Sequence, residues 1–267
     1  MDKRPIITLT TDFGYKDPFV GIMKGVMLKI NPSIDIIDIT HGITPQNILE
    51  ASFMIEMSFA YFPVKTIHVV VIDPGVGSVR RPILVITDHH YFIGPDNGVF
   101  SRIYNSTESL NVIQITAEHY FMPNRSSTFH GRDIFAPVAA WLSKDINVSR
   151  FGEPVADYVS LQVPVPLMPT SNVIEGEVIY TDRFGNATTN IKVEKIDDVA
   201  KNNPEAKPKV LFKNKEAPIK YHYSQVSDKG IYSLTNSFGY LELFVYKGSA
   251  SSDYGIVVGE KVTVILA

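Results

Sequence analysis

The chain has 267 residues, 45% of them apolar, a formal net charge of −3 and no cysteine. This length suits one large domain or two smaller ones, of which we favour two, and the small net charge argues against nucleic acid as a partner. The lack of cysteine excludes disulfides, thiolate metal ligands and thiol nucleophiles, and no apolar run reaches the roughly 18 residues of a membrane-spanning helix, so we expect a soluble, cytoplasmic protein without a membrane partner.

The first part of the chain alternates predicted strands and helices. Apolar and β-branched runs predict strands at residues 6–10, 34–39 and 66–72, and apolar residues at helical spacing predict helices at 18–30 and 47–62. This order predicts an α/β N-terminal domain with a mostly parallel central sheet and helices on both faces. Ligands of such sheets bind at the carboxyl ends of the strands, where Asp12 and Asp73 fall.

Three further elements are predicted before the middle of the chain. Strands are expected at 82–87 and 91–93, and a helix at 131–144, in which Pro137 marks a kink or a late start because proline lacks the backbone N–H.

The second part of the chain differs in character. Between residues 152 and 169 stand four prolines, which predict a linker. Short alternating runs follow, punctuated by Gly, Asn and Asp, as in a small antiparallel barrel or sandwich. These runs lie at 175–191, 209–213, 217–223, 230–234, 240–247 and 260–266. We therefore predict an α/β catalytic domain at 1–160, a proline-rich linker at 161–171 and an all-β barrel domain at 172–267.

The run VVVIDPGVGSVRR carries the strongest chemical signal. It places Asp73 at the end of an apolar strand, followed by a glycine turn, Arg80 and Arg81. A carboxylate and a guanidinium beside a buried strand would be held together and partly desolvated, although a surface ion pair is the alternative. The run lacks the lysine and hydroxyl of a phosphate-binding loop, so we expect its glycines to let the backbone approach a ligand closely.

Two other residues extend this reading. His130, in STFHGRD, adds a second titratable group, although a histidine there is more often a helix-start residue whose neighbours cap the helix. Together with Asp73 and Arg80 it suggests chemistry on a polar bond with water as the reactant. Asp12, in TTDFG, could accept hydrogen bonds from both hydroxyls of a ribose, and a role in the turn is equally compatible.

Two other chemistries are less favoured. A metal site would have to use residues that lack the spacing of any known site, and no G-x-S-x-G segment indicates a serine hydrolase. The imaginable metal ligands are His41, His68, His89, His90, Asp73 and Asp88.

Seven segments in order resemble the S-adenosyl-L-methionine hydroxide adenosyltransferase family, which is related to the 5′-fluoro- and 5′-chloroadenosine synthases. They are TLTTDFG, ITHGI, VIDPGVGSVRR, GPDNGVF, STFHGRDIFAP, DRFGN and NSFGYLEL, spanning Ile6 to about Ala250. The resemblance implies conversion of S-adenosyl-L-methionine and water to adenosine and L-methionine without a metal or other cofactor. It also implies a parallel-sheet α/β domain joined to a C-terminal β-barrel, and a homotrimer whose substrate lies between the first domain of one subunit and the barrel of the next.

The same resemblance assigns roles to individual residues. Asp73, Arg80 and His130 would activate water, and Asp12 would hold the ribose. The barrel would supply Asp182 for the methionine ammonium, Asn186 for adenine, Ser237 for the methionine carboxylate and a backbone contact to adenine near Ala250. Halide-using relatives lack both the carboxylate of Asp73 and the histidine of His130, so this chain favours water. Phe238 stands where an arginine can follow the serine in some relatives.

Three other functions are compatible with the same pocket. A sensor would bind an adenosyl compound without turnover. A halide-dependent adenosyltransferase would release a 5′-halonucleoside. A methyltransferase would need a methyl acceptor and would release S-adenosylhomocysteine.

Overall fold

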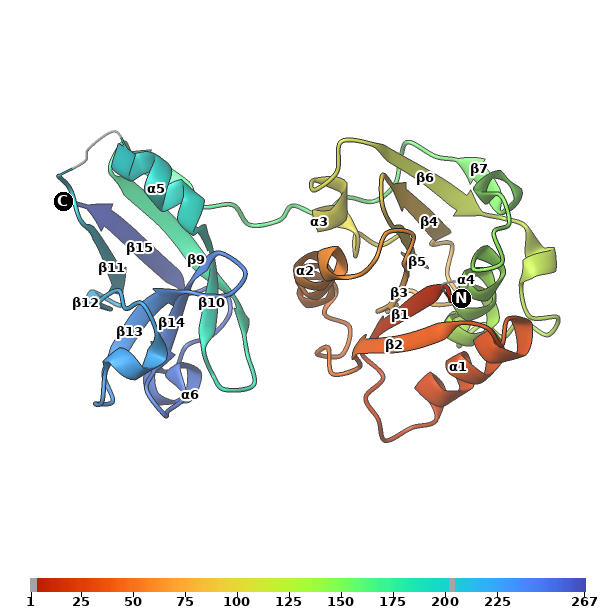
Figure 1. The fold of residues 1–267 in the computed structure, drawn as a ribbon, viewed down its shortest axis with the longest axis horizontal. Helices are drawn as coiled ribbons and strands as arrows, with labels where there is room; N and C mark the ends of the chain where they lie inside the picture. Colours follow the sequence, from red (N-terminus) through yellow and green to blue (C-terminus); the bar gives the residue numbers. More distant parts are fainter. Residues whose placement is uncertain (1–3, 202–204) are drawn as a thin grey trace. The chain divides into compact units, whose positions relative to one another are not determined.

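The computed structural model describes residues 4–201 and 205–267, which form two compact units divided between Val163 and Pro164 (Figure 1). No helix within these residues is long and apolar enough to cross a membrane. Each unit has a sheet and a hydrophobic core of its own.

The N-terminal unit is built on a seven-stranded sheet of order β2-β1-β3-β5-β4-β6-β7. Strands β2, β1, β3 and β5 run parallel, but β4 pairs antiparallel with both β5 and β6, and β6 pairs antiparallel with β7. The strands are β1 (Ile6–Thr11), β2 (Asp35–Thr40), β3 (Ile67–Val71), β4 (Pro82–Thr87), β5 (Tyr91–Pro95), β6 (Leu110–Ile115) and β7 (Gly152–Pro154).

The sheet is therefore mixed, and the prediction of a mostly parallel sheet holds only for its first half. Strands β4 and β5 are joined by three residues, and the Thr87 N–H donates to the His90 carbonyl across this turn at 3.1 Å. Two parallel neighbouring strands need a crossover of a dozen or more residues between them. A connection of three residues therefore forces β4 and β5 to pair antiparallel.

Helices cover both faces of this sheet, as predicted (Figure 1). On one face α1 and α4 pack against Ile7 and Leu9, and on the other α2 and α3 pack against Val70 and Ile72. Burial on both faces explains the continuous apolar run of β3. The helices are α1 (Phe19–Ile30), α2 (Ile48–Ser58), α3 (Ser101–Tyr104) and α4 (Ala136–Leu142), with short 3₁₀ turns at Phe59–Tyr61, Glu118–Tyr120 and Val148–Arg150.

The predicted helix at 131–144 begins as a wider turn. Residues Gly131–Phe135 form a π-helical turn, and the regular helix α4 starts at Ala136. Pro137 cannot donate to the Asp133 carbonyl, and the Met122 N–H donates to that carbonyl instead, at 2.9 Å. Proline thus delays the α-helix and leaves a carbonyl that ties the preceding loop to it.

The C-terminal unit is a nearly closed, barrel-like antiparallel sheet of order β12-β11-β15-β9-β10-β14-β13, with β8 added beside β9. The prediction of a strand at 217–223 is wrong, because this segment pairs with Ser233 only at an isolated bridge. Ser233 of β13 forms hydrogen bonds with Ala217, Pro218 and Lys220, and these hold the segment beside β13. The strands are β8 (Leu167–Thr170), β9 (Val173–Thr181), β10 (Ala187–Lys192), β11 (Pro208–Phe212), β12 (Lys215–Glu216), β13 (Ile231–Thr235), β14 (Tyr240–Val245) and β15 (Lys261–Leu266).

Two helices of this unit were not predicted, α5 (Val193–Lys201) and α6 (Ala250–Tyr254), and a 3₁₀ turn lies at Tyr223–Gln225. The proline-bearing stretch also contains strands at its two ends, β7 and β8. Both are edge strands, Pro154 ending one and Pro169 lying within the other, where a missing N–H costs least.

Candidate active site

Asp73, Arg80 and His130 converge at the carboxyl end of β3. The Arg80 guanidinium donates to both oxygens of Asp73, through Nε to Oδ1 at 2.8 Å and through Nη2 to Oδ2. The same Nη2 lies 2.7 Å from Nδ1 of His130. The Arg80 and Asp73 side chains are only 9% and 6% exposed, so this ion pair is held away from bulk water. The expected desolvated pair is thus present for Arg80, and the alternative of a surface ion pair is wrong.

Arg81 points elsewhere. Its Nε donates to Asp96 at 2.8 Å and its Nη1 donates to Asp157 at 2.7 Å. The two consecutive arginines therefore serve different carboxylates, and one of them points inward next to the buried strand, as the sequence suggested.

The glycine turn after Asp73 docks against the segment that carries His130. Gly77 has φ +78°, and a Cβ placed there would lie 2.3 Å from the Ser127 carbonyl oxygen. The close approach expected of these glycines is thus made to another part of the backbone. It brings the Asp73–Arg80 turn against residues 127–130.

The cap of the helix that follows His130 is built from other residues. The Ser126 hydroxyl accepts from the Phe129 N–H at 3.1 Å, and Asp133 accepts from both the N–H and the hydroxyl of Ser126. Asp133 is also paired with Arg132 at 2.6 Å. His130 makes no side-chain capping bond here, and its ring is turned to Arg80.

The surroundings of His130 hold its ring neutral. Burial, followed by the positive charge of Arg80, lowers the pKa of His130 below its ordinary value, and the charge of Asp73 opposes this only in part. An arginine can only donate, so Nδ1 of His130 accepts and the proton of the neutral ring resides on Nε2. In this arrangement His130 presents a donor, and the carboxylate of Asp73 is the basic group.

Asp12 joins Asp73 and His130 in one cavity of about 280 Å³. Its Oδ2 accepts from the Gln46 N–H at 2.8 Å. Phe13 and Phe129 form an apolar part of the lining. The cavity lies where the carboxyl ends of β1 and β3 meet, which is where such sheets bind ligands. A second cavity, of about 520 Å³, also reaches Arg80 and His130.

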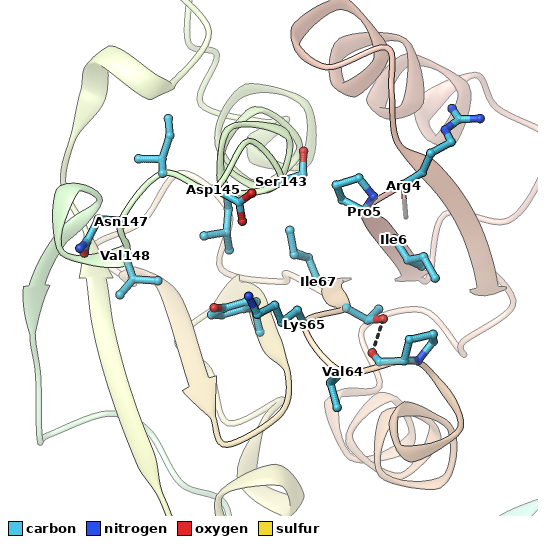
Figure 2. A pocket seen from close by; sticks show the side chains of 15 residues that line it. Arg4, Pro5, Ile6, Val64, Lys65, Ile67, Ser143, Asp145, Asn147 and Val148 are labelled. Atoms are coloured by element: carbon cyan, nitrogen blue, oxygen red, sulfur yellow. Dashed lines mark hydrogen bonds between the residues drawn. The ribbon is translucent and has the colours of Figure 1, made fainter. Parts of the chain in front are cut away.

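A further cavity, of about 560 Å³, lies at the opposite ends of the strands (Figure 2). Ile6 and Ile67, the first residues of β1 and β3, line it together with Arg4, Lys65 and Asp145. It contains none of the predicted site residues. Cavity volume therefore does not distinguish this end of the sheet from the end that carries Asp12 and Asp73.

In the barrel-like unit, Asp182 and Asn186 occupy the turn between β9 and β10. Asp182 Oδ1 accepts from the N–H groups of Phe184 and Asn186, at 2.9 and 2.8 Å, and its Oδ2 accepts from Asn186 Nδ2 at 3.0 Å. Helix α6, which begins at the buried Ala250, is held against this turn because the Ser251 N–H donates to the Gly185 carbonyl at 2.9 Å. Asp182, Asn186 and Ala250 thus lie in one neighbourhood.

Ser237 lies in the exposed turn between β13 and β14. Beside it the structure reveals a carboxyl group that the sequence did not indicate, Glu242, which is 5% exposed. Tyr223 donates to its Oε1 at 2.8 Å and Asn236 donates to its Oε2 at 3.2 Å. Burial raises the pKa of Glu242 despite these bonds. The only signal was a charged residue within an otherwise apolar strand, YLELFV.

The histidines considered as metal ligands do not gather at one site. His68 and His90 are buried together in the sheet, 3.4 Å apart from Nε2 to Nδ1, and His41 lies beside Asp38. Among residues 4–201 and 205–267, no group of three or more histidine or carboxylate side chains is placed to hold a metal ion.

Comparison with known proteins gives consistent matches over most of the chain. Models of the SAM hydroxide adenosyltransferase N-terminal and C-terminal domains match residues 7–152 and 176–263. A (R)-S-adenosyl-L-methionine hydrolase from Methanocaldococcus jannaschii is 37% identical, over 92% of this chain and 90% of that protein. A fluorinase from Actinoplanes sp. is 24% identical over 98% of each chain. A crystal structure of an uncharacterized conserved protein from Thermotoga maritima superposes with a TM-score of 0.89 at 34% identity, covering 97% of this chain and 99% of that one.

Proposed function

We propose that this chain, which belongs to the SAM hydroxide adenosyltransferase family because models of both of that family's domains match it, hydrolyses S-adenosyl-L-methionine to adenosine and L-methionine. Relatives from Methanocaldococcus jannaschii and Thermus thermophilus carry the name (R)-S-adenosyl-L-methionine hydrolase, and we extend the (R) configuration at sulfur to this chain. The observation that carries the proposal is the cluster of Asp73, Arg80 and His130, in which Asp73 and His130 line the cavity that contains Asp12.

The proposed reaction is an in-line displacement at C5′ of the substrate. The oxygen of water forms a bond to C5′ while the C5′–S bond breaks, and its electron pair leaves with sulfur, so methionine departs as a neutral thioether. One proton of the water is released. Because the leaving group needs neither protonation nor polarisation, the reaction requires no metal and no general acid.

The difficulty lies in the nucleophile, since the pKa of water is about 15.7 and hydroxide is scarce at neutral pH. Asp73 is the group that takes up the proton, because its carboxylate oxygens can accept. His130 donates from Nε2 and orients the water, and the positive charge of Arg80 stabilises the developing hydroxide. This assigns the proton transfer to Asp73 alone, whereas the resemblance to the family assigns the activation of water to Asp73, Arg80 and His130 jointly.

The remaining residues are proposed to bind the substrate. Asp12 accepts hydrogen bonds from the ribose hydroxyls, Asp182 binds the methionine ammonium and Asn186 binds adenine, with Ser237 at the carboxylate and the backbone at Ala250 against adenine. We also propose a homotrimer in which the barrel of a neighbouring subunit supplies these last contacts. Phe238 carries no charge that could pair with the methionine carboxylate. We therefore propose that neutral donors such as Ser237 bind this carboxylate.

Turnover in ¹⁸O-labelled water tests the reaction directly. The purified protein is incubated separately with the (R) and (S) sulfonium epimers, and the products are separated by chromatography and weighed by mass spectrometry. We expect adenosine labelled at its 5′ oxygen, formed faster from the (R) epimer. Unlabelled adenosine would exclude attack of water at C5′, and equal rates would exclude the stereochemical assignment.

The same incubation distinguishes the alternatives. A sensor would return the substrate unchanged, and a methyltransferase would yield S-adenosylhomocysteine once an acceptor is supplied. Because fluorinases are among the relatives, chloride and fluoride are added in parallel samples. A 5′-halonucleoside formed in preference to adenosine would replace the hydrolase proposal with halide transfer.

A further inference from the structure

The ITHGI segment has no role in the chemistry described so far, yet it lies directly beside the loop that carries Asp12. Strand β2 pairs parallel with β1, and the register shifts between the pairs Leu9–Asp38 and Thr10–Thr40. Ile39 is therefore an extra residue on β2, a bulge. Residues three apart in a regular strand face opposite sides of the sheet, but this bulge brings Asp38 and His41 to the same side, together with Thr11.

These side chains form one chain of polar contacts. Lys24 donates to Asp38 Oδ2 at 2.6 Å, and Asp38 Oδ1 lies 3.1 Å from Nε2 of His41. On the other side of the ring, Nδ1 of His41 lies 2.8 Å from the Thr11 hydroxyl, and that hydroxyl accepts from the Phe13 N–H at 3.2 Å.

The direction of each bond follows from the chemistry of its ends. With the proton of His41 on Nε2, facing the carboxylate, Nδ1 accepts from the Thr11 hydroxyl, whose oxygen is left to accept from Phe13. His41 is 1% exposed and Thr11 is fully buried, so water does not compete for these bonds. Asp38 Oδ1 and His41 Nε2 are both buried and neither makes a well-directed hydrogen bond within the described residues, so their 3.1 Å approach is an electrostatic contact.

This series of polar contacts ends on the backbone of the loop at 12–14. Besides the Thr11–Phe13 bond, the His41 carbonyl accepts from the Gly14 N–H at 2.8 Å. The loop is thus attached to His41 at both its side chain and its carbonyl. The Phe13 ring lies edge-on to that of Phe129, 6.0 Å away, in the segment that carries His130.

We propose that Thr11 and His41, supported by Asp38 and Lys24, are positioning residues that fix the loop at 12–14 and so hold Asp12 in place for the ribose. They touch no substrate themselves. The proposal rests on the proposed function in one respect, namely that Asp12 binds the ribose of an adenosyl compound.

The same strand provides a matched control. The Thr8 hydroxyl lies 2.7 Å from Nδ1 of His68, and both residues are fully buried. Thr8→Val and Thr11→Val therefore remove the same group from the same kind of bond, but Thr8 lies in the middle of β1, away from Asp12. Thr11→Ser retains the hydroxyl and serves as the rescue variant.

The test measures KM and kcat for S-adenosyl-L-methionine and, by calorimetry, the Kd of adenosine. We expect Thr11→Val to raise KM and Kd about tenfold, the equivalent of losing one hydrogen bond between a ribose hydroxyl and the Asp12 carboxylate. The value of kcat should stay within about threefold of the wild type. Thr8→Val should lose as much thermal stability but keep the wild-type KM, and Thr11→Ser should recover most of the affinity. Should Thr11→Val not fold, His41→Asn, which cannot reach Asp38, takes its place with the same expectation.

The outcomes separate the two proposals. If the wild type hydrolyses the substrate and Thr11→Val behaves like Thr8→Val, the positioning role is wrong and the proposed function stands. If the wild type binds adenosine without turning over the substrate, the hydrolase proposal fails and the Kd values alone decide the positioning role. A wild type that binds neither compound overturns both.

Discussion

Replacing Asp73 by Asn should separate the catalytic function of the carboxylate from its structural one. The change preserves shape but leaves one acceptor oxygen where Arg80 donates two hydrogen bonds, so an amide N–H must face a guanidinium N–H. Removing one partner of a buried ion pair costs about 3–5 kcal/mol. Arg80 keeps its contacts with His130 and with the Phe135 ring, 5.3 Å away, so we expect about 3 kcal/mol in the free energy of unfolding.

The catalytic loss should be larger in effect. Without the carboxylate no group in the cluster can accept the proton of water, because Nδ1 of His130 is occupied by Arg80. We expect kcat to fall about 10³-fold, equivalent to about 4 kcal/mol, with KM within a few-fold of the wild type, since Asp73 is not proposed to bind the substrate.

A matched control is available in the neighbouring ion pair. Asp96 accepts from Arg81 Nε at 2.8 Å and its side chain is 2% exposed. Asp96→Asn should therefore destabilise the fold comparably but leave kcat nearly unchanged. Adenosine formation is measured by chromatography and stability by urea unfolding, at a temperature where both variants are folded. A wild-type kcat in Asp73→Asn, or an equal loss in Asp96→Asn, would refute the assignment of Asp73 as the base.

Three further predictions concern pH and backbone geometry. Because the pKa of His130 is lowered and its neutral form is the one proposed to act, kcat/KM should fall only as pH drops below 6.5; a limb centred above that value contradicts a neutral His130. Burial lowers the pKa of His68 to about 3, so as the pH falls the unfolded chain takes up a proton on this histidine before the folded chain does. The free energy of unfolding should therefore decline by about 5 kcal/mol between pH 6.5 and pH 3. Urea midpoints of the wild type and His68→Gln at several pH values measure this pH dependence. Gly77→Ala should lose about 3 kcal/mol of stability and most of its activity, because the added methyl group would meet the Ser127 carbonyl. Gly239→Ala is the control: Gly239 has a similar φ of +79° but nothing within 4 Å of the added methyl group, so it should lose only about 1 kcal/mol. Equal melting temperatures for the two variants would show that the clash at Gly77 is relieved.

Most regular elements of the N-terminal unit could be predicted because the local pattern of apolar and polar residues indicates which positions are buried. The apolar run of β3 needs a sheet buried on both faces, and Asp12 and Asp73 follow parallel strands whose carboxyl ends meet at one edge. The antiparallel half was harder, since the direction of β4 depends on a three-residue connection and on its neighbours. Strand β6 was not predicted; its sequence LNVIQI does not alternate, because the buried Val112 and Ile113 are adjacent and lie between polar residues.

The barrel-like unit shows where local pattern fails. Helix α5 is short and polar, and its only signal is the spacing of Val193, Ile196 and Val199, which bury one side against the sheet. Glu242 is the one charged residue of the otherwise apolar strand β14, and the strand pattern does not reveal that Tyr223 and Asn236 from neighbouring segments hydrogen-bond to its carboxyl group. Such burial depends on residues distant in sequence, and periodicity carries no information about them.

The sequence by itself determined which residues could carry the chemistry and part of their arrangement. Asp73 and Arg80 are seven residues apart around one turn, so short-range geometry suffices to pair them. His130 joins them from fifty residues away because Gly77 lets two backbones meet and a π-helical turn precedes α4. A bulge in β2 likewise turns His41 toward Thr11, and nothing in the order of residues announces that shift. Long-range packing sets the strand register and the side-chain rotamers together, so only the tertiary structure decided that the guanidinium of Arg80, the carboxylate of Asp73 and the imidazole of His130 would meet.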